Sequence, residues 1–199
     1  DQRDFGHDCQ ADAFLLQRVA RPRGDRHRAA AGVGRADREC AGGDLVFGTA
    51  ADPVVLDGAL VSDGESLRAI DQMFEGLVTL KEGSTEVVPG LAESWEADPA
   101  GTAWTFQLRD GVKFHDGTDF NAEAVCFNFD RWYNFKGPLQ SPSASYYYSA
   151  FFGGFKNNES EDLSDPLYKS CEARNPTTAV ITLTRPSASL LGALVQQSF

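Results

Sequence analysis

Residues 104–117 read WTFQLRDGVKFHDG, and this stretch carries the clearest structural pattern in the chain. Large apolar residues alternate with polar ones in its first half, which is the period of a half-buried β-strand. Each half is followed by an Asp-Gly pair, which has the composition of a tight turn. We therefore predict a hairpin in which Trp104–Arg109 pairs with Val112–Phe114, with its aromatic face inward.

A helix is predicted directly after this hairpin. The Asn121 side chain can accept a hydrogen bond from an unpaired backbone N–H of the first turn, and Glu123 would lie in that electropositive turn. Val125, Phe129 and Trp132 follow at helical spacing and are expected to form the buried face.

Weaker patterns extend outward in both directions. They predict strands at Leu45–Thr49, Leu77–Leu80 and Ala179–Thr184, a helix at Ser66–Phe74 ended by Gly76, and a short helix after Pro186 through Leu190 and Leu194. Pro138–Pro142 interrupts the pattern, and an aromatic run follows on what we predict to be a loop. Its members are Tyr146, Tyr147, Tyr148, Phe151 and Phe152.

The charge is unevenly distributed. The 199 residues carry a formal net charge of −11, but residues 1–43 hold eight Arg and seven acids, so the remainder carries −12. A body this acidic repels phosphate backbones and anionic membranes, which argues against nucleic acid as a partner. No run of apolar residues is long enough to predict a membrane-spanning helix.

Residues 1–43 show no sustained helical or strand period, and we assign them no fold. They are either disordered or the product of an aberrant reading frame that replaced the signal region. Cys40 precedes Ala41 and two glycines, where a lipid-modified cysteine would begin a mature surface protein. The charged residues just before it do not suit a lipoprotein cleavage site, so an unmodified cysteine stays an equal alternative.

Catalytic patterns are weak. His115 is the only histidine after residue 43, and it lies at a turn without the partners of a nucleophilic dyad. Glu159 and Glu161 fit a solvated acidic loop better than a glycosidase pair. The four cysteines do not have the spacing of a zinc site. We predict no catalytic residues, no metal and no cofactor.

Two of the cysteines suit a disulfide. Cys126 lies on the predicted helix, and Cys171 lies before the last predicted strand. A bond between them would close a loop of about 45 residues, and such a bond forms in oxidising compartments. The alternative is a pair of buried free thiols.

Several consecutive stretches together resemble the signature of one family. They are residues 89–95 (PGLAESW), residues 104–117, and residues 121–125 (NAEAV) followed by Phe129 and Arg131. The family is the peptide, nickel and oligopeptide class of ABC solute-binding proteins, family 5, and the resemblance covers about 155 residues from Asp44 onward. Asp119 departs from it, because the family usually has proline there.

The resemblance implies an α/β fold of the periplasmic-binding-protein-like type II, which has two lobes. More than half of the family's length is missing, so we expect an incomplete N-terminal fragment. Residues 44–70 would start lobe I, residues 71–186 would form a small α+β subdomain with the signature, and residues 187–199 would re-enter lobe I before a truncation. The signature aromatics Trp95, Trp104, Phe106 and Phe114 are expected to fill a core.

The resemblance also implies a function. It predicts the substrate-binding component of an ABC importer, not an enzyme, which binds an oligopeptide or similar small solute and delivers it to membrane permease subunits. We expect a monomer in the periplasm or at the cell surface, either free or attached to the membrane through a lipid anchor at Cys40. A fragment of this length is not expected to bind its solute alone. A secreted hydrolase and a non-functional truncated reading frame are the alternatives.

Ligand contacts can be placed only loosely from the resemblance. The loop after the first strand and the region after the signature helix correspond to Ala51, Asp52 and Tyr146–Tyr148. Aromatic side chains there would suit stacking on a solute. The alternative is that these tyrosines pack within the subdomain.

Overall fold

The structure of the chain is a computed structural model that describes residues 48–195. The segment 1–43 with Cys40, most of the strand predicted at Leu45–Thr49 and residues 196–199 lie outside the described residues. Gly48 and Thr49, which are described, are not part of a strand.

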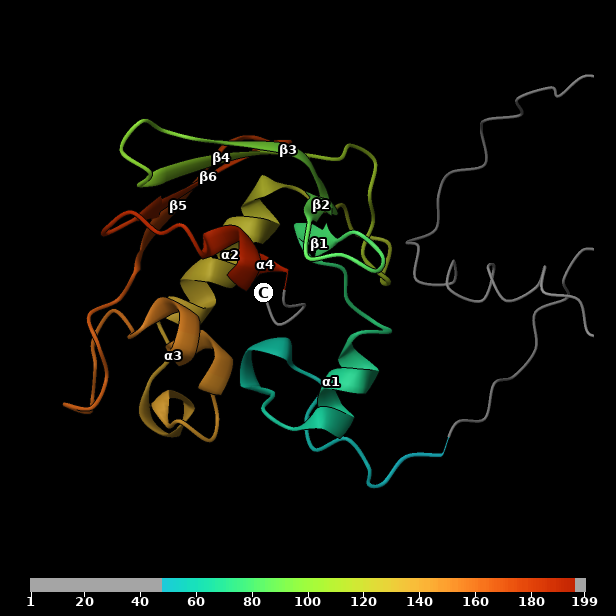
Figure 1. The fold of residues 1–199 in the computed structure, drawn as a ribbon, viewed down its shortest axis with the longest axis vertical. Coiled ribbons are helices and arrows are strands. Elements are labelled where there is room, and N and C mark those ends of the chain that lie inside the picture. Colours follow the sequence, from blue (N-terminus) through green and yellow to red (C-terminus); the bar gives the residue numbers. More distant parts are fainter. Residues whose placement is uncertain (1–47, 196–199) are drawn as a thin grey trace, which may run out of the picture.

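An antiparallel sheet forms one layer of the described chain (Figure 1). Its strands lie in the order β3-β4-β6-β5, with bounds Ala92–Ala97 for β3, Ala103–Leu108 for β4, Tyr168–Asn175 for β5 and Thr178–Leu183 for β6. Phe106 in β4 lies opposite Trp95 on one side and Ala179 on the other. The strands predicted around Trp104–Arg109 and Ala179–Thr184 are therefore confirmed to within one residue.

The predicted hairpin is wrong in its pairing. Both edges of β4 are occupied, one by β3 and one by β6, so residues 112–114 have no free edge to join. These residues instead fold back on residues 118–120 around the Asp116-Gly117 turn, with a single bridge from Lys113 to Asp119. The β3–β4 turn is closed by the Asp98 carboxylate, which accepts hydrogen bonds from the backbone N–H groups of Thr102 and Ala103 at 2.7 and 2.8 Å.

The expected aromatic core is also only partly correct. Phe106 is fully buried, and Trp95 and Trp104 are partly buried against the same core. Phe114 is 44% exposed, because its segment folds back on itself outside the sheet, and its ring meets the Phe120 ring edge to face with centroids 5.9 Å apart.

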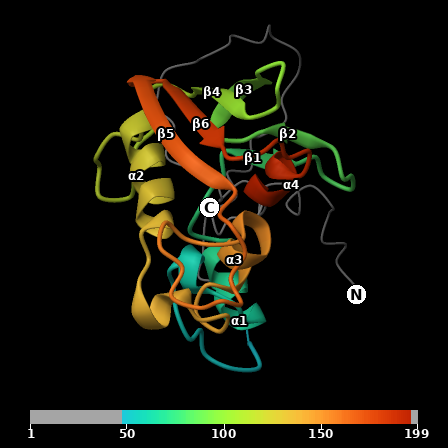
Figure 2. The ribbon, with the colours of Figure 1, turned by 90° about the vertical axis from the view of Figure 1, so that its left-hand side faces the viewer.

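The helix α2 (Ala122–Tyr133) covers one face of the sheet and runs beside β5 (Figure 2). Asn121 Oδ1 accepts a hydrogen bond from the Ala124 N–H at 2.9 Å, which confirms the predicted start of the helix. Val125, Phe129 and Trp132 are buried, as their spacing predicts. The Tyr168 hydroxyl of β5 donates a 2.6 Å hydrogen bond to Asp130, which ties the helix to the edge strand.

The remaining elements surround this two-layer unit. They are the 3-10 turn η2 (Gly58–Leu60), α1 (Gly64–Ile70), β1 (Val78–Leu80) paired with β2 (Val87–Pro89), the 3-10 turn η3 (Gly137–Gln140), α3 (Tyr146–Phe152) and α4 (Leu190–Leu194). The short strand β1 and the helix α4 agree with the sequence predictions.

The helix α1 ends earlier than predicted. It stops at Ile70, and the chain does not continue as helix to Gly76. Met73 and Phe74 are 37% and 47% exposed, so they gain little from burial. Short helices depend on packing of an apolar face, which explains why the helical spacing of these two residues does not extend α1.

The aromatic run is a helix, not the predicted loop. Tyr148 and Phe152 lie one turn apart on the inner face of α3 and are 1% and 0% exposed. Gly153 ends the helix with a positive φ of 82°, a conformation that L side chains rarely adopt.

Gly90 explains part of the signature sequence. It lies where the chain leaves β2 and donates a hydrogen bond to the Leu77 carbonyl at 3.2 Å. A Cβ atom at this position would lie 2.5 Å from the Gly76 carbonyl oxygen and 3.0 Å from the Leu77 carbonyl oxygen. Only glycine permits this close approach of two backbone segments.

Gly90→Ala is therefore expected to lower the free energy of unfolding by about 2 kcal/mol, because backbone must move to admit the methyl group. Gly192→Ala is the matched control, since a Cβ there meets nothing within 4 Å inside α4. This control is expected to raise stability by up to about 1 kcal/mol through helix propensity. Urea unfolding of both variants checks the sign of each change, and equal effects would contradict the packing argument.

Candidate functional site

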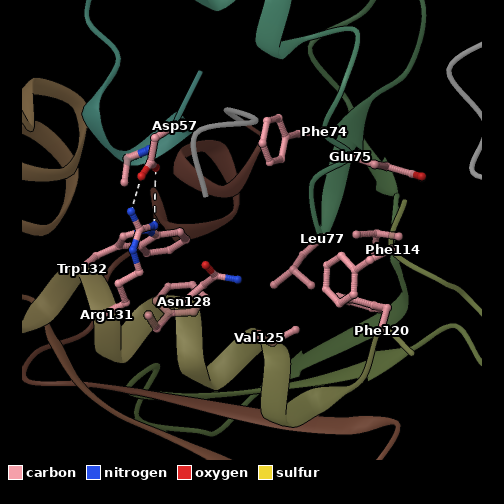
Figure 3. A pocket seen from close by; sticks show the side chains of 14 residues that line it. Asp57, Phe74, Glu75, Leu77, Phe114, Phe120, Val125, Asn128, Arg131 and Trp132 are labelled. Atoms are coloured by element: carbon pink, nitrogen blue, oxygen red, sulfur yellow. Dashed lines mark hydrogen bonds and ion pairs between the residues drawn. The ribbon is translucent and has the colours of Figure 1, made fainter. Parts of the chain in front are cut away.

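A cavity of about 170 Å³ lies between the N-terminal segment and α2 (Figure 3). It is lined by Asp57, Gly58, Ala59, Phe74, Glu75, Leu77, Leu91, Phe114, Phe120, Val125, Asn128, Phe129, Arg131 and Trp132. The lining comes from η2, the connection from α1 to β1, Leu91 before β3, the turn segment 112–120 and the face of α2 that carries Val125 and Phe129.

Most of the cavity wall is apolar. Leu77, Val125 and Phe129 are buried and form its floor, while Phe74 and Phe114 are half-exposed at its rim. The lining side chains include no Ser, Cys, His or Lys. This apolar wall suits the binding of an apolar group.

Polar groups lie at one end of the cavity. Arg131 forms an ion pair with Asp57 through two hydrogen bonds, one from Nη2 to Oδ2 and one from Nη1 to Oδ1 at 3.4 Å (Figure 3). The guanidinium also lies over the Phe135 ring at 5.5 Å from its centroid. The Asn128 amide projects toward the cavity and donates to the Ala124 carbonyl at 3.2 Å.

None of the five residues predicted to contact a ligand lines this cavity. Ala51 and Asp52 are exposed near the start of the described chain, where the Ala51 carbonyl accepts a hydrogen bond from Thr49 at 2.9 Å. No hydrogen bond in the described part of the chain joins Ala51 or Asp52 to the tyrosines of α3.

The three tyrosines have different surroundings. Tyr146 is 53% exposed and Tyr147 is partly buried, and their rings meet edge to face at 5.3 Å. Tyr148 is stacked against Phe152 and Phe155 with ring centroids 5.2 and 5.0 Å apart. Burial raises the pKa of the Tyr148 hydroxyl far above its ordinary value, with a smaller contribution from Tyr133. Tyr148 therefore packs in the core, as the alternative interpretation of this cluster expected.

The cysteines predicted to pair lie together. Cys126 on α2 is bonded to Cys171 on β5, with their Cα atoms 5.1 Å apart. The bond connects the helix to the same edge strand that the hydrogen bond from Tyr168 to Asp130 reaches. Among the described residues, no group of three or more His, Cys, Asp or Glu side chains is arranged to hold a metal ion.

The Asp57–Arg131 pair was not predicted from the sequence. Arg131 lies in the last turn of α2, where a cation is favoured by the helix dipole without any partner, and Asp57 precedes Gly58 as an ordinary cap. The two residues are 74 positions apart, so no local pattern indicates that they meet.

The comparisons with known proteins agree on one family. The model of the bacterial extracellular solute-binding proteins, family 5 Middle, matches residues 86–199. Heme-binding protein A of Haemophilus influenzae is 37% identical over 157 residues, which are 75% of this chain and 27% of that protein. The dipeptide-binding protein of Escherichia coli is 34% identical over 75% of this chain and 28% of its own length.

Solved structures give the same result. The periplasmic binding protein DppA of Helicobacter pylori, in complex with the peptide STSA, has a TM-score of 0.56 and 32% identity over 74% of this chain and 28% of that chain. NikA of Brucella suis, in complex with Fe(III)-EDTA, has a TM-score of 0.57 and 29% identity over 76% and 26%. The chain thus spans about a quarter of the length of these relatives and carries part of the α/β fold of type II periplasmic binding proteins.

The match covers more than half of the chain and includes the residues 89–95, 104–117 and 121–125 that carry the resemblance in the sequence. The chain belongs to the bacterial extracellular solute-binding proteins of family 5.

Proposed function

We propose that this chain is part of the substrate-binding component of an ABC importer, whose complete form binds oligopeptides or a similar small solute. The observation that carries the proposal is the family match over residues 86–199, supported by relatives named for dipeptide and di/tripeptide binding. Members of this family are binding proteins rather than enzymes, which disfavours the hydrolase alternative.

The proposed mechanism is closure of two lobes around the solute by hinge bending, followed by delivery to permease subunits. We divide the chain accordingly: residues 44–70 start lobe I, residues 71–186 form the small subdomain, and residues 187–199 return toward lobe I. In this proposal Ala51, Asp52 and the exposed Tyr146 edge the ligand cleft, while Tyr148 supports the subdomain from within.

The proposed location is extracytoplasmic, in the periplasm or at the cell surface. Family members are periplasmic or extracytoplasmic proteins, and the Cys126–Cys171 bond needs an oxidising compartment. No helix of the described residues is long and apolar enough to cross a membrane. Monomeric state and lipid attachment at Cys40 belong to the proposal as well, and Cys40 lies outside the described residues.

The proposal predicts that the 199-residue chain binds peptides more weakly than a protein of the relatives' full length. Calorimetry with a mixture of di- and tripeptides is expected to show micromolar or tighter binding to a form extended to the length of the relatives. The 199-residue chain is expected to bind at least about a hundredfold more weakly, because a solute enclosed by two lobes loses most of its contacts when one is missing.

Mass spectrometry of the peptides after incubation separates the receptor from the hydrolase alternative. Intact peptides together with heat of binding support the receptor. Turnover of the peptides, or equally tight binding by the 199-residue chain, contradicts the proposal.

A further inference from the structure

Residues 54–70, which lead into and include α1, form a small unit. The Ser66 hydroxyl, which is fully buried, accepts hydrogen bonds from the backbone N–H groups of Val54 and Val55 at 2.8 and 3.2 Å. Ser66 in turn donates its own backbone N–H to Asp63 at 2.8 Å. These hydrogen bonds hold the chain from Val54 to α1 together as one unit, which also packs on the rest of the fold through Ala59 in the core and through η2 against α3.

The cavity separates this unit from α2. Across the cavity of about 170 Å³ the lining side chains of the two walls are not packed against each other, although Ala59 and Leu77 belong to the same core as Val125 and Phe129 of α2. Proteins normally fill their interiors to crystal-like density, and a void gives up the contacts that would fix one wall against the other. The relative position of the two walls therefore depends on the contacts around the cavity, which are the packing of Ala59 in the shared core and the polar contacts at the rim.

Asp57 is the polar rim contact between these walls. Its carboxylate accepts a hydrogen bond from the Ala59 N–H at 3.1 Å, which caps η2, and it also accepts both hydrogen bonds from Arg131 on α2. Both side chains are about one-third exposed, and the Phe135 ring beneath the guanidinium limits where Arg131 can lie. The Asp57 carboxylate thus caps η2 and also connects η2 to α2 through Arg131.

We propose that the Asp57–Arg131 pair is a positioning contact that sets where the segment from Ala51 to Val61 lies relative to the subdomain. The inference rests on the proposed function, in which Ala51 and Asp52 at the start of this segment edge the ligand cleft. Arg131 does not touch the solute in this account. It acts through Asp57, by keeping the cleft edge in one position.

Hydrogen exchange of the 199-residue chain, without any solute, tests the pair directly. Arg131→Met keeps the apolar stem over Phe135 but removes the charge, and Asp57→Asn keeps an oxygen that can cap η2. Each variant is expected to speed amide exchange in residues 51–62 by about fivefold, the scale of a partly exposed ion pair. Exchange in β4 and β6 is expected to stay unchanged.

Four comparisons make the result specific. The double variant is expected to exchange no faster than the single ones, because both remove one interaction. Arg131→Lys should recover part of the protection, and about 1 M salt should bring the native chain toward the Arg131→Met rate. Lys81→Met is the matched control, since it removes the exposed pair between Lys81 and Glu86 on the β1–β2 hairpin and should leave residues 51–62 unaffected.

Unchanged exchange in residues 51–62 would overturn the proposal, and so would faster exchange throughout the sheet, which indicates a general loss of stability. Both outcomes leave the receptor function untouched, since no solute is present. If peptide binding by an extended protein fails while these exchange rates behave as expected, the positioning contact stands and the proposed function falls.

Discussion

Replacing Cys126 and Cys171 with alanine is expected to lower the free energy of unfolding by about 4 kcal/mol. The bond closes a loop with a sequence separation of 45, and a cross-link of this span removes roughly that much conformational freedom from the unfolded chain. Small domains have stabilities of about 5–15 kcal/mol, so the loss is a large share of the total. The native contacts change little, because alanine fits where each half-cystine packs.

The experiment is best done in a background that carries Cys9→Ala and Cys40→Ala, so that no other cysteine can exchange with the pair. Urea unfolding of this background, with and without dithiothreitol, should show the same loss as the alanine variants. The bond is absent in solution if reduction leaves the unfolding midpoint unchanged. Labelling of both Cys126 and Cys171 in the oxidised, denatured protein would lead to the same conclusion.

The elements that the sequence predicts well are those specified by neighbouring residues. The start of α2 was predictable because the Asn121 side chain caps the helix by accepting a hydrogen bond from Ala124, only three residues away. The buried face of the helix follows from the spacing of Val125, Phe129 and Trp132. The strand β4 follows from alternation alone. In each case the deciding interaction lies within a few positions in the chain.

The pairing of the strands could not be predicted from neighbouring residues. β4 pairs with β6, so that Gln107 lies opposite Thr178, and the Thr178 hydroxyl donates to the Gln107 amide oxygen at 2.9 Å. The predicted partner, residues 112–114, is nearer in sequence and joined by a suitable turn. Nothing in the alternation of β4 distinguishes a near partner from a distant one, because both offer the same backbone hydrogen bonds.

The helix α3 could have been predicted. Tyr148 and Phe152 are both buried and are spaced by four residues, which is a helical spacing. This spacing is hard to recognise because exposed aromatic residues lie among the buried ones. The two glycines that follow, Gly153 and Gly154, favoured the prediction of a loop. This helix matters for the site, because it buries the Tyr148 ring in the core, which is the alternative that the sequence left open for the tyrosine cluster.

The cavity and its ion pair could not be predicted from the sequence. The walls come from residues near 57, 75 and 128, and their separation depends on how α1 and α2 are placed by the rest of the fold. Asp57 and Arg131 each have a sufficient local explanation, one as a cap and one as a helix-end cation. Only the three-dimensional arrangement shows that they contact each other.

Phe106→Ala is expected to cost the chain about 4 kcal/mol of unfolding free energy. Phe106 is fully buried in the second strand of the sheet, opposite Trp95 and Ala179 in the neighbouring strands. Removing the ring takes apolar surface out of the core and leaves a cavity beneath α2. A strand held on both sides by hydrogen bonds cannot collapse into that space.

Phe127→Ala provides the matched control, because Phe127 lies on α2 but is 67% exposed. Its loss is expected to change stability by less than about 0.5 kcal/mol, since surface substitutions away from a packed site have small effects and alanine favours the helix. Phe106→Leu, which keeps most of the apolar volume, should lose about 1.5 kcal/mol and remains measurable if the alanine variant does not fold. Urea midpoints followed by tryptophan fluorescence rank the three variants. An equal loss at Phe106 and Phe127 would show that the β4 aromatic marks the family without stabilising the core, since the expected contrast rests on the burial of Phe106 and the exposure of Phe127.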